Sequence, residues 1–275
     1  MNIEKQKQLS QFYTKPEYAQ YCYNQIEKLI DLNNYFLIEP SAGNGAFSSL
    51  FHKNSIAFDI EPKNENITNK DFFDFNYNEI QTDLKFITIG NPPFGRNSSL
   101  ALKFINKSAL YSDYVCFILP KTFKKNSIIN RIDRKLHLIY HIDVPFNSFI
   151  LNENECNVPC IFQIWEKREV DRELIIEKKT TEYFDFVNKE EADIAIRRVG
   201  SLSGKLFTNF AQYQESSHYF IKFKNDEMIL DMIFRLKLCY GLFQREAKNT
   251  AGNPSLSKSE LIREFEMTFH NSNKY

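Results

Sequence analysis

The 275-residue sequence has neither a net charge nor a long hydrophobic run. Lysine plus arginine and aspartate plus glutamate both number 35, which argues against a protein that coats nucleic acid by bulk charge but not against a local basic face. The longest apolar stretches, such as residues 114–119, are strand-sized, whereas a bilayer-spanning helix needs about 20 residues. Residues 1–10 are polar and charged. We therefore expect an intracellular, cytoplasmic protein with no signal peptide.

Cysteine is also scarce and lacks the spacing of a metal site. The chain has five cysteines, an odd number that does not favour a disulfide framework. Cys156 and Cys160 form one C-x3-C pair, but no second pair or nearby histidine completes a zinc site. We expect reduced thiols and no metal. Internal repeats and low-complexity tracts are absent as well, and the 15% of aromatic residues excludes a disordered chain.

The first 165 residues alternate between helix-like and strand-like segments. We expect Thr14 to cap a helix that begins near Pro16. The expected helices are 16–30, 46–53, 100–111 and 126–135, and the expected strands are 35–39, 55–60, 86–90, 114–119, 138–144 and 159–166. Such alternation predicts an α/β fold with a mostly parallel sheet and helices on both of its faces.

The composition changes after Trp165. Residues 171–193 contain eight acidic and four basic side chains, which indicates a solvated connector with one weak strand. We therefore predict three parts: a catalytic domain at 1–170, a connector at 171–194 and a small C-terminal α+β unit at 195–275.

A glycine loop follows the first predicted strand. Glu39 and Pro40 end this strand, and Gly43 and Gly45 precede the next helix. Glycines at a helix start let the backbone approach a nucleotide-sized ligand. A third glycine is missing, because Ser48 stands in its place, and the loop lacks the Lys-Ser/Thr of a P-loop. The carboxylate suits a cationic or amino group. A plain strand–turn–helix corner is the alternative interpretation.

Two further acids follow at strand-end positions. Asp59 ends the second strand, 20 residues after Glu39, where an acid can accept from both hydroxyls of a ribose. Asp71 and Phe72 follow, and this pair suits an adenine amino group and ring. Taken alone, each acid also fits a solvated position at a strand end.

The most specific motif is Asn91-Pro92-Pro93-Phe94, directly after the third strand. Two prolines fix the backbone and remove two N–H donors, so the Pro92 carbonyl is free to accept a hydrogen bond. Asn91 adds a side-chain acceptor and Phe94 a ring face. The motif therefore suits a flat group that carries an NH2. A rigid exposed turn is the alternative.

With these motifs, residues 11–167 resemble the class I AdoMet-dependent methyltransferases, in particular the N6-adenine DNA type. Gln11 to Pro16 is similar to the family's N-terminal Tyr/Phe-Thr-x-Pro motif, and Asn91 to Phe94 is similar to its catalytic [N/D/S]-P-P-[Y/F/W] motif. Residues 118–120 resemble the strand-end segment that follows. The motif order is that of the gamma group, in which a recognition domain lies at the C-terminus.

The resemblance implies a Rossmann-like methyltransferase fold, AdoMet as cofactor and methyl transfer to the N6 atom of a flipped adenine in DNA. The implied catalytic residues are Asn91, Pro92, Pro93 and Phe94, with Phe94 stacked on the base. A second stacking aromatic is expected in the loop after Phe146, where we choose Phe149. The implied cofactor residues are Tyr13, Thr14, Glu39, Pro40, Gly43, Gly45, Asp59, Asp71, Phe72 and Asn91.

Three alternatives stay open. The first is an RNA N6-adenine methyltransferase. The second is a protein-glutamine methyltransferase, which is disfavoured because those enzymes lack the Tyr-Thr-x-Pro motif and usually have tyrosine where Phe94 stands. The third is a non-catalytic nucleic-acid-binding subunit, although a dead site has no chemical need for all the acids, glycines and Asn91.

A basic segment favours a nucleic-acid partner. Positions 121–135 contain only one acid, Asp133, and six cations: Lys121, Lys124, Lys125, Arg131, Arg134 and Lys135. We expect Lys121, Lys124 and Lys125 to contact phosphates, with a solvated helix face as the alternative. Arg197 and Arg198 are weaker candidates for the same contact.

Overall fold

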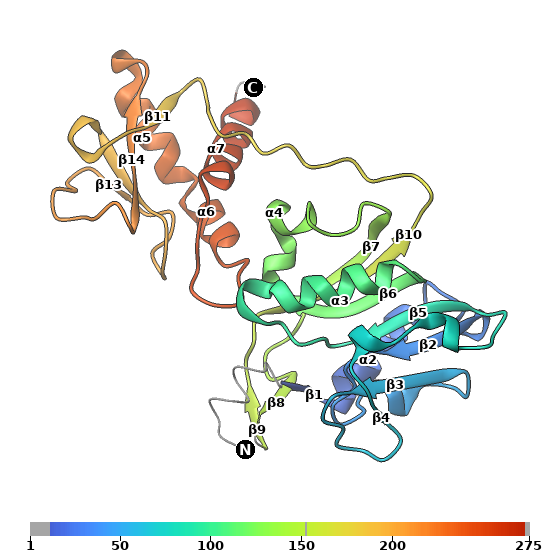
Figure 1. Cartoon of the computed structure of the whole chain (residues 1–275). Coiled ribbons are helices and arrows are strands. Elements are labelled where there is room, and N and C mark those ends of the chain that lie inside the picture. The colour runs from blue at the N-terminus through green and yellow to red at the C-terminus, as the bar shows by residue number, and fades with distance from the viewer. Residues whose placement is uncertain (1–11, 152, 273–275) are drawn as a thin grey trace. The chain divides into compact units, whose positions relative to one another are not determined.

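The computed structural model describes residues 12–151 and 153–272 (Figure 1). The chain divides into two compact units, Met1–Leu174 and Ile175–Tyr275. Each unit has a hydrophobic core of its own. Gln11, the first residue of the predicted N-terminal motif, lies outside the described residues. In the part of the chain that the structure describes, no helix is long and apolar enough to span a membrane.

A seven-stranded sheet forms the centre of the first unit. Its strands are β2 (Tyr35–Glu39), β3 (Ser55–Asp59), β4 (Thr68–Asn69), β5 (Lys85–Gly90), β6 (Ser112–Pro120), β7 (Leu136–Asp143) and β10 (Cys160–Lys167). Their spatial order is β4-β3-β2-β5-β6-β10-β7. β10 pairs antiparallel with both β6 and β7, and the other pairs are parallel.

This sheet has the Rossmann strand order 3-2-1-4-5-6, with one antiparallel strand inserted before its last member. The near-continuous apolar runs of β6 and β10 are consistent with their interior positions, between β5 and the edge strand β7, since strands buried on both faces lose the alternating pattern. Every residue of β6 from Val115 to Pro120 is buried. The mostly parallel sheet and its helices confirm the predicted α/β, methyltransferase-like fold class.

The helix α2 (Pro16–Glu27) packs Ala19, Cys22, Tyr23 and Ile26 into this core. Pro16 occupies its first turn, as expected, because the missing N–H of proline costs nothing there. The prediction that Thr14 caps the helix is wrong. Lys15 precedes the helix without a side-chain cap, and Thr14 belongs to a strand instead.

Two other predicted helices are shorter than expected. Residues 46–53 contain only a 3-10 turn at Ser48–Leu50, in which the Leu50 and Phe51 amides each donate to the carbonyl three residues earlier. The helix predicted at 126–135 is α4, Asn126–Ile129. Its end is fixed by the Arg172 guanidinium, which donates to the carbonyls of Ile129 and Ile132. The helix α3 (Ser99–Ala109) matches its prediction closely.

A small second sheet holds the N-terminal motif. β1 (Tyr13–Thr14) pairs with β8 (Phe149–Leu151), and β8 forms a hairpin with β9 (Asn154–Cys156). Thr14 lies opposite Phe149, and the Lys15 amide donates to the Ser148 carbonyl over 3.0 Å. The long loop between β7 and β10 thus fixes the segment that enters α2.

The second unit is a four-stranded antiparallel sheet with three helices. The sheet order is β11 (Phe184–Phe186), β14 (His218–Phe223), β12 (Ile194–Arg197) and β13 (Leu206–Phe207). The helices are α5 (Ile229–Leu238), α6 (Tyr240–Ala247) and α7 (Lys258–Ser272). Because β11 pairs with β14, residues 184–186 belong to this sheet, and the predicted connector at 171–194 extends too far.

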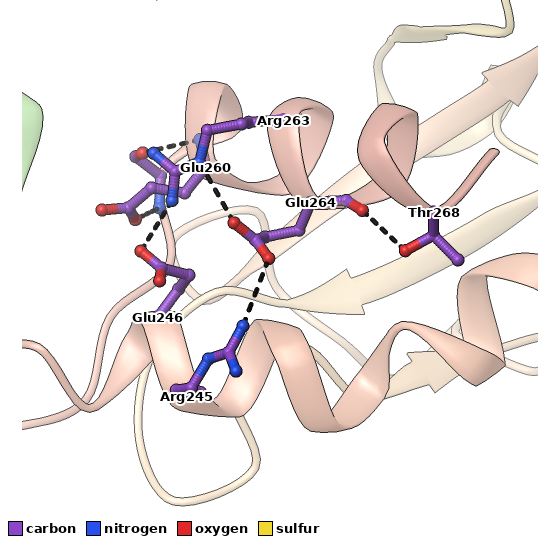
Figure 2. A network of polar contacts seen from close by, with 7 residues as sticks. Arg245, Glu246, Glu260, Arg263, Glu264 and Thr268 are labelled. Carbon is purple, nitrogen blue, oxygen red and sulfur yellow. Dashed lines mark hydrogen bonds and ion pairs between the residues drawn. The ribbon is translucent and has the colours of Figure 1, made fainter. Parts of the chain in front are cut away.

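Charged side chains link α6 to α7 (Figure 2). The Arg263 guanidinium donates to Glu246 over 2.7 Å and to Glu264 over 3.1 Å, and Arg245 lies 3.9 Å from Glu264. Ser257 and Glu260 form a reciprocal capping box at the start of α7. The acids of this network are therefore already used within the unit.

Candidate active site

A cavity of about 260 Å³ opens at the carboxyl ends of β2, β3 and β5, the position where ligands bind in open α/β sheets. All the predicted cofactor residues except Gly45 line it. Of the predicted catalytic residues, Asn91 and Pro93 line it and Pro92 and Phe94 do not. The full lining is Phe12, Tyr13, Thr14, Glu39, Pro40, Ser41, Ala42, Gly43, Asn44, Ala46, Phe47, Asp59, Ile60, Asp71, Phe72, Phe73, Asn91, Pro93, Leu100 and Phe104.

Asp59 organises the glycine loop. One carboxylate oxygen accepts from the Gly43 amide over 2.7 Å, and the other accepts from the Glu61 amide over 2.8 Å. Gly43 has a φ of +56°, and a Cβ placed there would lie 2.8 Å from the Tyr13 ring. Only glycine satisfies both conditions. The loop, β3 and the N-terminal motif are thus held against one another.

Glu39 is a buried carboxyl group at the cavity wall, with 2% of its surface exposed. One of its oxygens accepts from the Ser48 amide over 2.8 Å. Burial raises the pKa of Glu39 to about 8, and the nearby Asp59 charge adds to this effect, while the bond from Ser48 opposes it. A cationic group in the cavity would stabilise the ionised form.

Asn91 has a fixed orientation and one unused acceptor. Its amide nitrogen donates to the Phe12 carbonyl over 3.1 Å and to the Thr14 hydroxyl over 3.2 Å. A carbonyl oxygen can only accept, so the nitrogen must face Phe12. The Oδ1 atom is buried and has no hydrogen-bond partner among the described residues. Buried polar atoms are rarely left unpaired in proteins, and this atom therefore suggests a ligand donor.

The remainder of the catalytic motif is rigid and mostly buried. Pro92 is buried and Pro93 is half-buried. Phe94 belongs to the core with 6% of its surface exposed, and its carbonyl accepts from the amides of Leu100 and Ala101. The prediction that Phe94 presents a ring face to the ligand is not met in this structure, because its ring packs inside the protein and does not line the cavity.

The end of the cavity near Asp71 is aromatic. Asp71 accepts from the Phe73 amide over 2.8 Å and so caps the turn Phe72–Asp74. Phe72 is 1% exposed and stacks on Phe104 at 5.4 Å between ring centroids. Phe73 is 37% exposed and contacts the Phe104 ring edge-on. The sequence pattern selected Phe72, but Phe73 is the more accessible ring, and Phe104 was not predicted at all.

The choice of Phe149 as a stacking aromatic is wrong. Phe149 pairs with Thr14 in the small sheet and is 1% exposed, so its ring is not available to a base. Phe146, the residue passed over, is 83% exposed. It lines a second, open pocket with Lys15, Tyr21 and Pro145. A phenylalanine near a turn gives no sequence signal that distinguishes these two environments.

The basic segment at 121–135 is largely neutralised by acids distant in the sequence. Lys121 lies 2.9 Å from an Asp143 oxygen, and Lys124 pairs with the same carboxylate. Arg134 lies 3.6 Å from Asp171, and Lys135 lies 3.6 Å from Glu169. Asp133 is the only acid within the segment, but the fold brings three more acids to its cations from outside it.

The predicted substrate contact Arg197 is in the second unit. Its Nε donates to the Val199 carbonyl over 2.8 Å, and its Nη1 lies 3.5 Å from the Ser217 hydroxyl. Its guanidinium thus holds the turn after β12.

The structure contains no candidate metal site in residues 12–151 and 153–272, where no group of three or more histidine, cysteine or acidic side chains could hold a metal ion. The five cysteines are free thiols, and all but Cys156 are buried.

No family model and no curated protein matches the sequence. Among solved structures, the chain is similar to a protein of Pyrococcus horikoshii described as a "putative RNA methyltransferase", with 17% identity and a TM-score of 0.44 over 58% of this chain and 87% of that one. It is also similar to a protein of Thermoplasma acidophilum, with 18% identity and a TM-score of 0.38 over 62% of this chain and 100% of that one. The strand order of the sheet itself defines the methyltransferase-like fold.

Proposed function

We propose that the protein transfers a methyl group from AdoMet to the exocyclic N6 atom of adenine in DNA. The observation that carries the proposal is the Oδ1 atom of Asn91, which is buried and has no partner among the described residues. Asn91 lines the same cavity as Asp59 and the glycine loop. An amino group is the donor that this acceptor lacks.

The chemistry of the cavity lining fits AdoMet. Asp59 would accept from the ribose hydroxyls with the lone pairs that its two backbone bonds leave free. Asp71 would accept from the adenine amino group, and Phe73 would cover the ring. Glu39 would face the positively charged amino group of the methionine moiety, and this charge would oppose the burial that raises the pKa of Glu39 in the free protein. When bound, the cofactor supplies an electrophilic methyl group.

Asn91 and the Pro92 carbonyl would activate the substrate amine. The lone pair of an adenine amino nitrogen is delocalised into the ring, which makes the group planar and weakly nucleophilic. If Oδ1 and the Pro92 carbonyl each accept one N–H, the nitrogen becomes pyramidal and its lone pair is directed at the methyl group. This is positional and electrostatic catalysis. As the N–C bond forms, the S–C bond would break and leave a neutral thioether, and the methylated nitrogen, then cationic and acidic, would lose one proton to water, so no side chain need act as a strong base.

The rigidity of the motif supports this mechanism. Asn91 cannot rotate without losing the bonds to Phe12 and Thr14, and prolines at positions 92 and 93 fix the following backbone. The acceptors are therefore positioned before substrate binds. Inside a duplex the amino group is paired and stacked, so the adenine must leave the helix to reach this site.

The test is incubation with isotopically labelled AdoMet and mixed-sequence DNA or RNA, followed by mass analysis of the nucleosides. The proposal predicts labelled N6-methyl-2′-deoxyadenosine from DNA. Label in N6-methyladenosine from RNA alone would overturn the choice of DNA and keep the amine chemistry. Label on a carbon or a ring nitrogen, or on added protein, would overturn the mechanism.

A further inference from the structure

Two loops of the second unit are joined into one surface. The Gly200 amide donates to the Pro254 carbonyl, and the Leu256 amide donates to the Arg198 carbonyl, both over 2.8 Å. Val199 and Ser255 form an isolated antiparallel bridge. The segment after β12 and the segment before α7, some 50 residues apart in sequence, are therefore fixed side by side.

These loops hold two cations against two aromatic rings. The Arg198 guanidinium lies 5.3 Å from the centre of the Tyr219 ring. Lys258 Nζ lies 4.5 Å from the centre of the Phe186 ring and 5.8 Å from that of Tyr219. The two rings contact each other edge to face at 5.4 Å. We call Phe186, Arg198, Tyr219 and Lys258 the cation–aromatic cluster.

Neither cation of this cluster has a carboxylate partner. Among the described residues, Arg198 and Lys258 form no ion pair, whereas Arg245 and Arg263 of the same unit are paired with acids (Figure 2). The Glu260 carboxylate lies close enough to Tyr219 to contribute to the raised pKa of that ring, and it accepts from the Ser257 amide in the capping box. Arg198 Nε is buried and has no hydrogen-bond partner within residues 12–151 and 153–272.

A guanidinium that lies over a ring and forms no ion pair among the described residues is suited to a phosphate group. Arginine presents its N–H donors in a rigid fork that matches phosphate oxygens, and the cation–π contact with Tyr219 limits the motion of that fork. Lys258 is exposed and adds a second positive charge beside the same ring. Cations interleaved with aromatic rings are the usual combination on nucleic-acid-binding surfaces.

We propose that the cation–aromatic cluster binds the phosphodiester backbone of the nucleic-acid substrate. The choice of this polyanion rests on the proposed function. The cluster thereby takes the role that the sequence pattern assigned to Lys121 and Lys124, which share the carboxylate of Asp143.

The experiment measures the binding of a fluorescent 30-nucleotide DNA, single-stranded and duplex, to the full chain across a range of salt concentrations. The variant is Arg198→Gln with Lys258→Gln. Each phosphate contact contributes about 0.7 to 0.9 to the slope of log affinity against log salt, so the double variant should lose about 1.5 units of slope and at least tenfold in affinity near 0.1 M salt. The same oligonucleotides as RNA form a parallel arm.

The matched control is Lys237→Gln with Lys248→Gln, which removes the same charge from exposed positions of the same unit and should leave the slope within about half a unit of that of the parent protein. An unchanged slope in the cluster variant, or an equal loss in the control, would overturn the proposal. If Arg198→Gln unfolds the unit, the exposed Lys258→Gln alone must remove close to one unit of slope. The assay contains no AdoMet, so a failure to methylate would count against the proposed function and not against this site.

Discussion

At the scale of single residues, the site depends on two side chains that are incompletely satisfied. Asn91 offers a buried acceptor without a donor, and Glu39 is a carboxyl group held where its ionised form is disfavoured. Both conditions cost stability in the free protein. A ligand with an amino group near Asn91 and a positive charge near Glu39 would relieve both. Their location in one cavity is the reason for reading them as a binding site.

Glu39 predicts a specific pH dependence. Its pKa in the folded protein, about 8, exceeds the usual value of about 4.3 in an unfolded chain. The contribution of Glu39 to stability is therefore fully present below pH 4 and is lost as the pH rises through 8. Between pH 5 and pH 8 the parent protein should lose up to about 1.4 kcal/mol of stability per pH unit relative to Glu39→Gln. Urea unfolding of both proteins at pH 5.5, 7 and 8.5 measures this difference.

The same residue should couple AdoMet binding to proton release. A cation bound near Glu39 lowers its pKa, so at pH 7 the parent protein should release close to one proton on binding, and Glu39→Gln should release none. Calorimetry in buffers of different ionisation enthalpy counts the protons. Parallel stability curves for the two proteins, with no proton release, would show that Glu39 is ionised in the free protein.

At the scale of elements, the glycine loop joins three parts of the chain. Gly43 contacts the Tyr13 ring on one side and bonds to Asp59 on the other. Gly43→Ala should therefore displace β1 as well as strain the loop, because the new Cβ would lie 2.8 Å from a ring carbon. We expect AdoMet affinity to fall at least tenfold. Gly252→Ala, where a Cβ meets nothing within 4 Å, is the control that should bind normally.

Strands could be predicted from the sequence more accurately than helices. Buried strands such as β5 and β6 are short apolar runs between polar turns, and that pattern is local. The helix expected at 46–53 is only a 3-10 turn. The helix expected at 126–135 was shortened by a tertiary contact, from Arg172 to the carbonyls of Ile129 and Ile132. No local pattern contains that partner.

The site was predictable where a motif fixes the backbone and not where packing chooses among equivalent side chains. Glu39, Asp59 and Asn91 stand at strand ends, and parallel strands bring their carboxyl ends to one edge. The aromatic residues of the site were predicted less accurately. Phe72 and Phe73 are neighbours of the same type, and only the core decides that Phe72 is buried beneath Phe104. Phe149 and Phe146 show the same limit.

At the scale of the whole molecule, charge pairing changes the expected nucleic-acid surface. The sequence has equal numbers of acids and bases, so each local basic run must be judged by the acids that the fold brings to it. Asp143, Glu169 and Asp171 neutralise much of the 121–135 segment, and this pairing cannot be seen in the order of residues. Arg198, by contrast, has no such partner.

The division of the chain into two units predicts where a protease cuts first. Between β10 and β11 the chain has no regular element, and Leu174 and Ile176 are 51% and 92% exposed. Arg172 is held by three carbonyls, so trypsin should cut first at the exposed Lys179 and leave two resistant fragments. Mass spectrometry of a brief digest identifies the bond. First cleavage inside the sheet of either unit would contradict the division.

The most direct test of the account is single-turnover methylation by Asn91→Ala on a DNA duplex that the parent protein methylates, with AdoMet affinity measured in parallel. Removing one preorganised acceptor typically costs 10² to 10³ in rate, or about 3–4 kcal/mol. We predict a loss of that size with AdoMet affinity within threefold of the parent value, because in the proposed mechanism Oδ1 would face the substrate amine and not the adenosine of the cofactor. A near-normal rate for Asn91→Ala would contradict the amine-activation mechanism, whatever the nucleic acid.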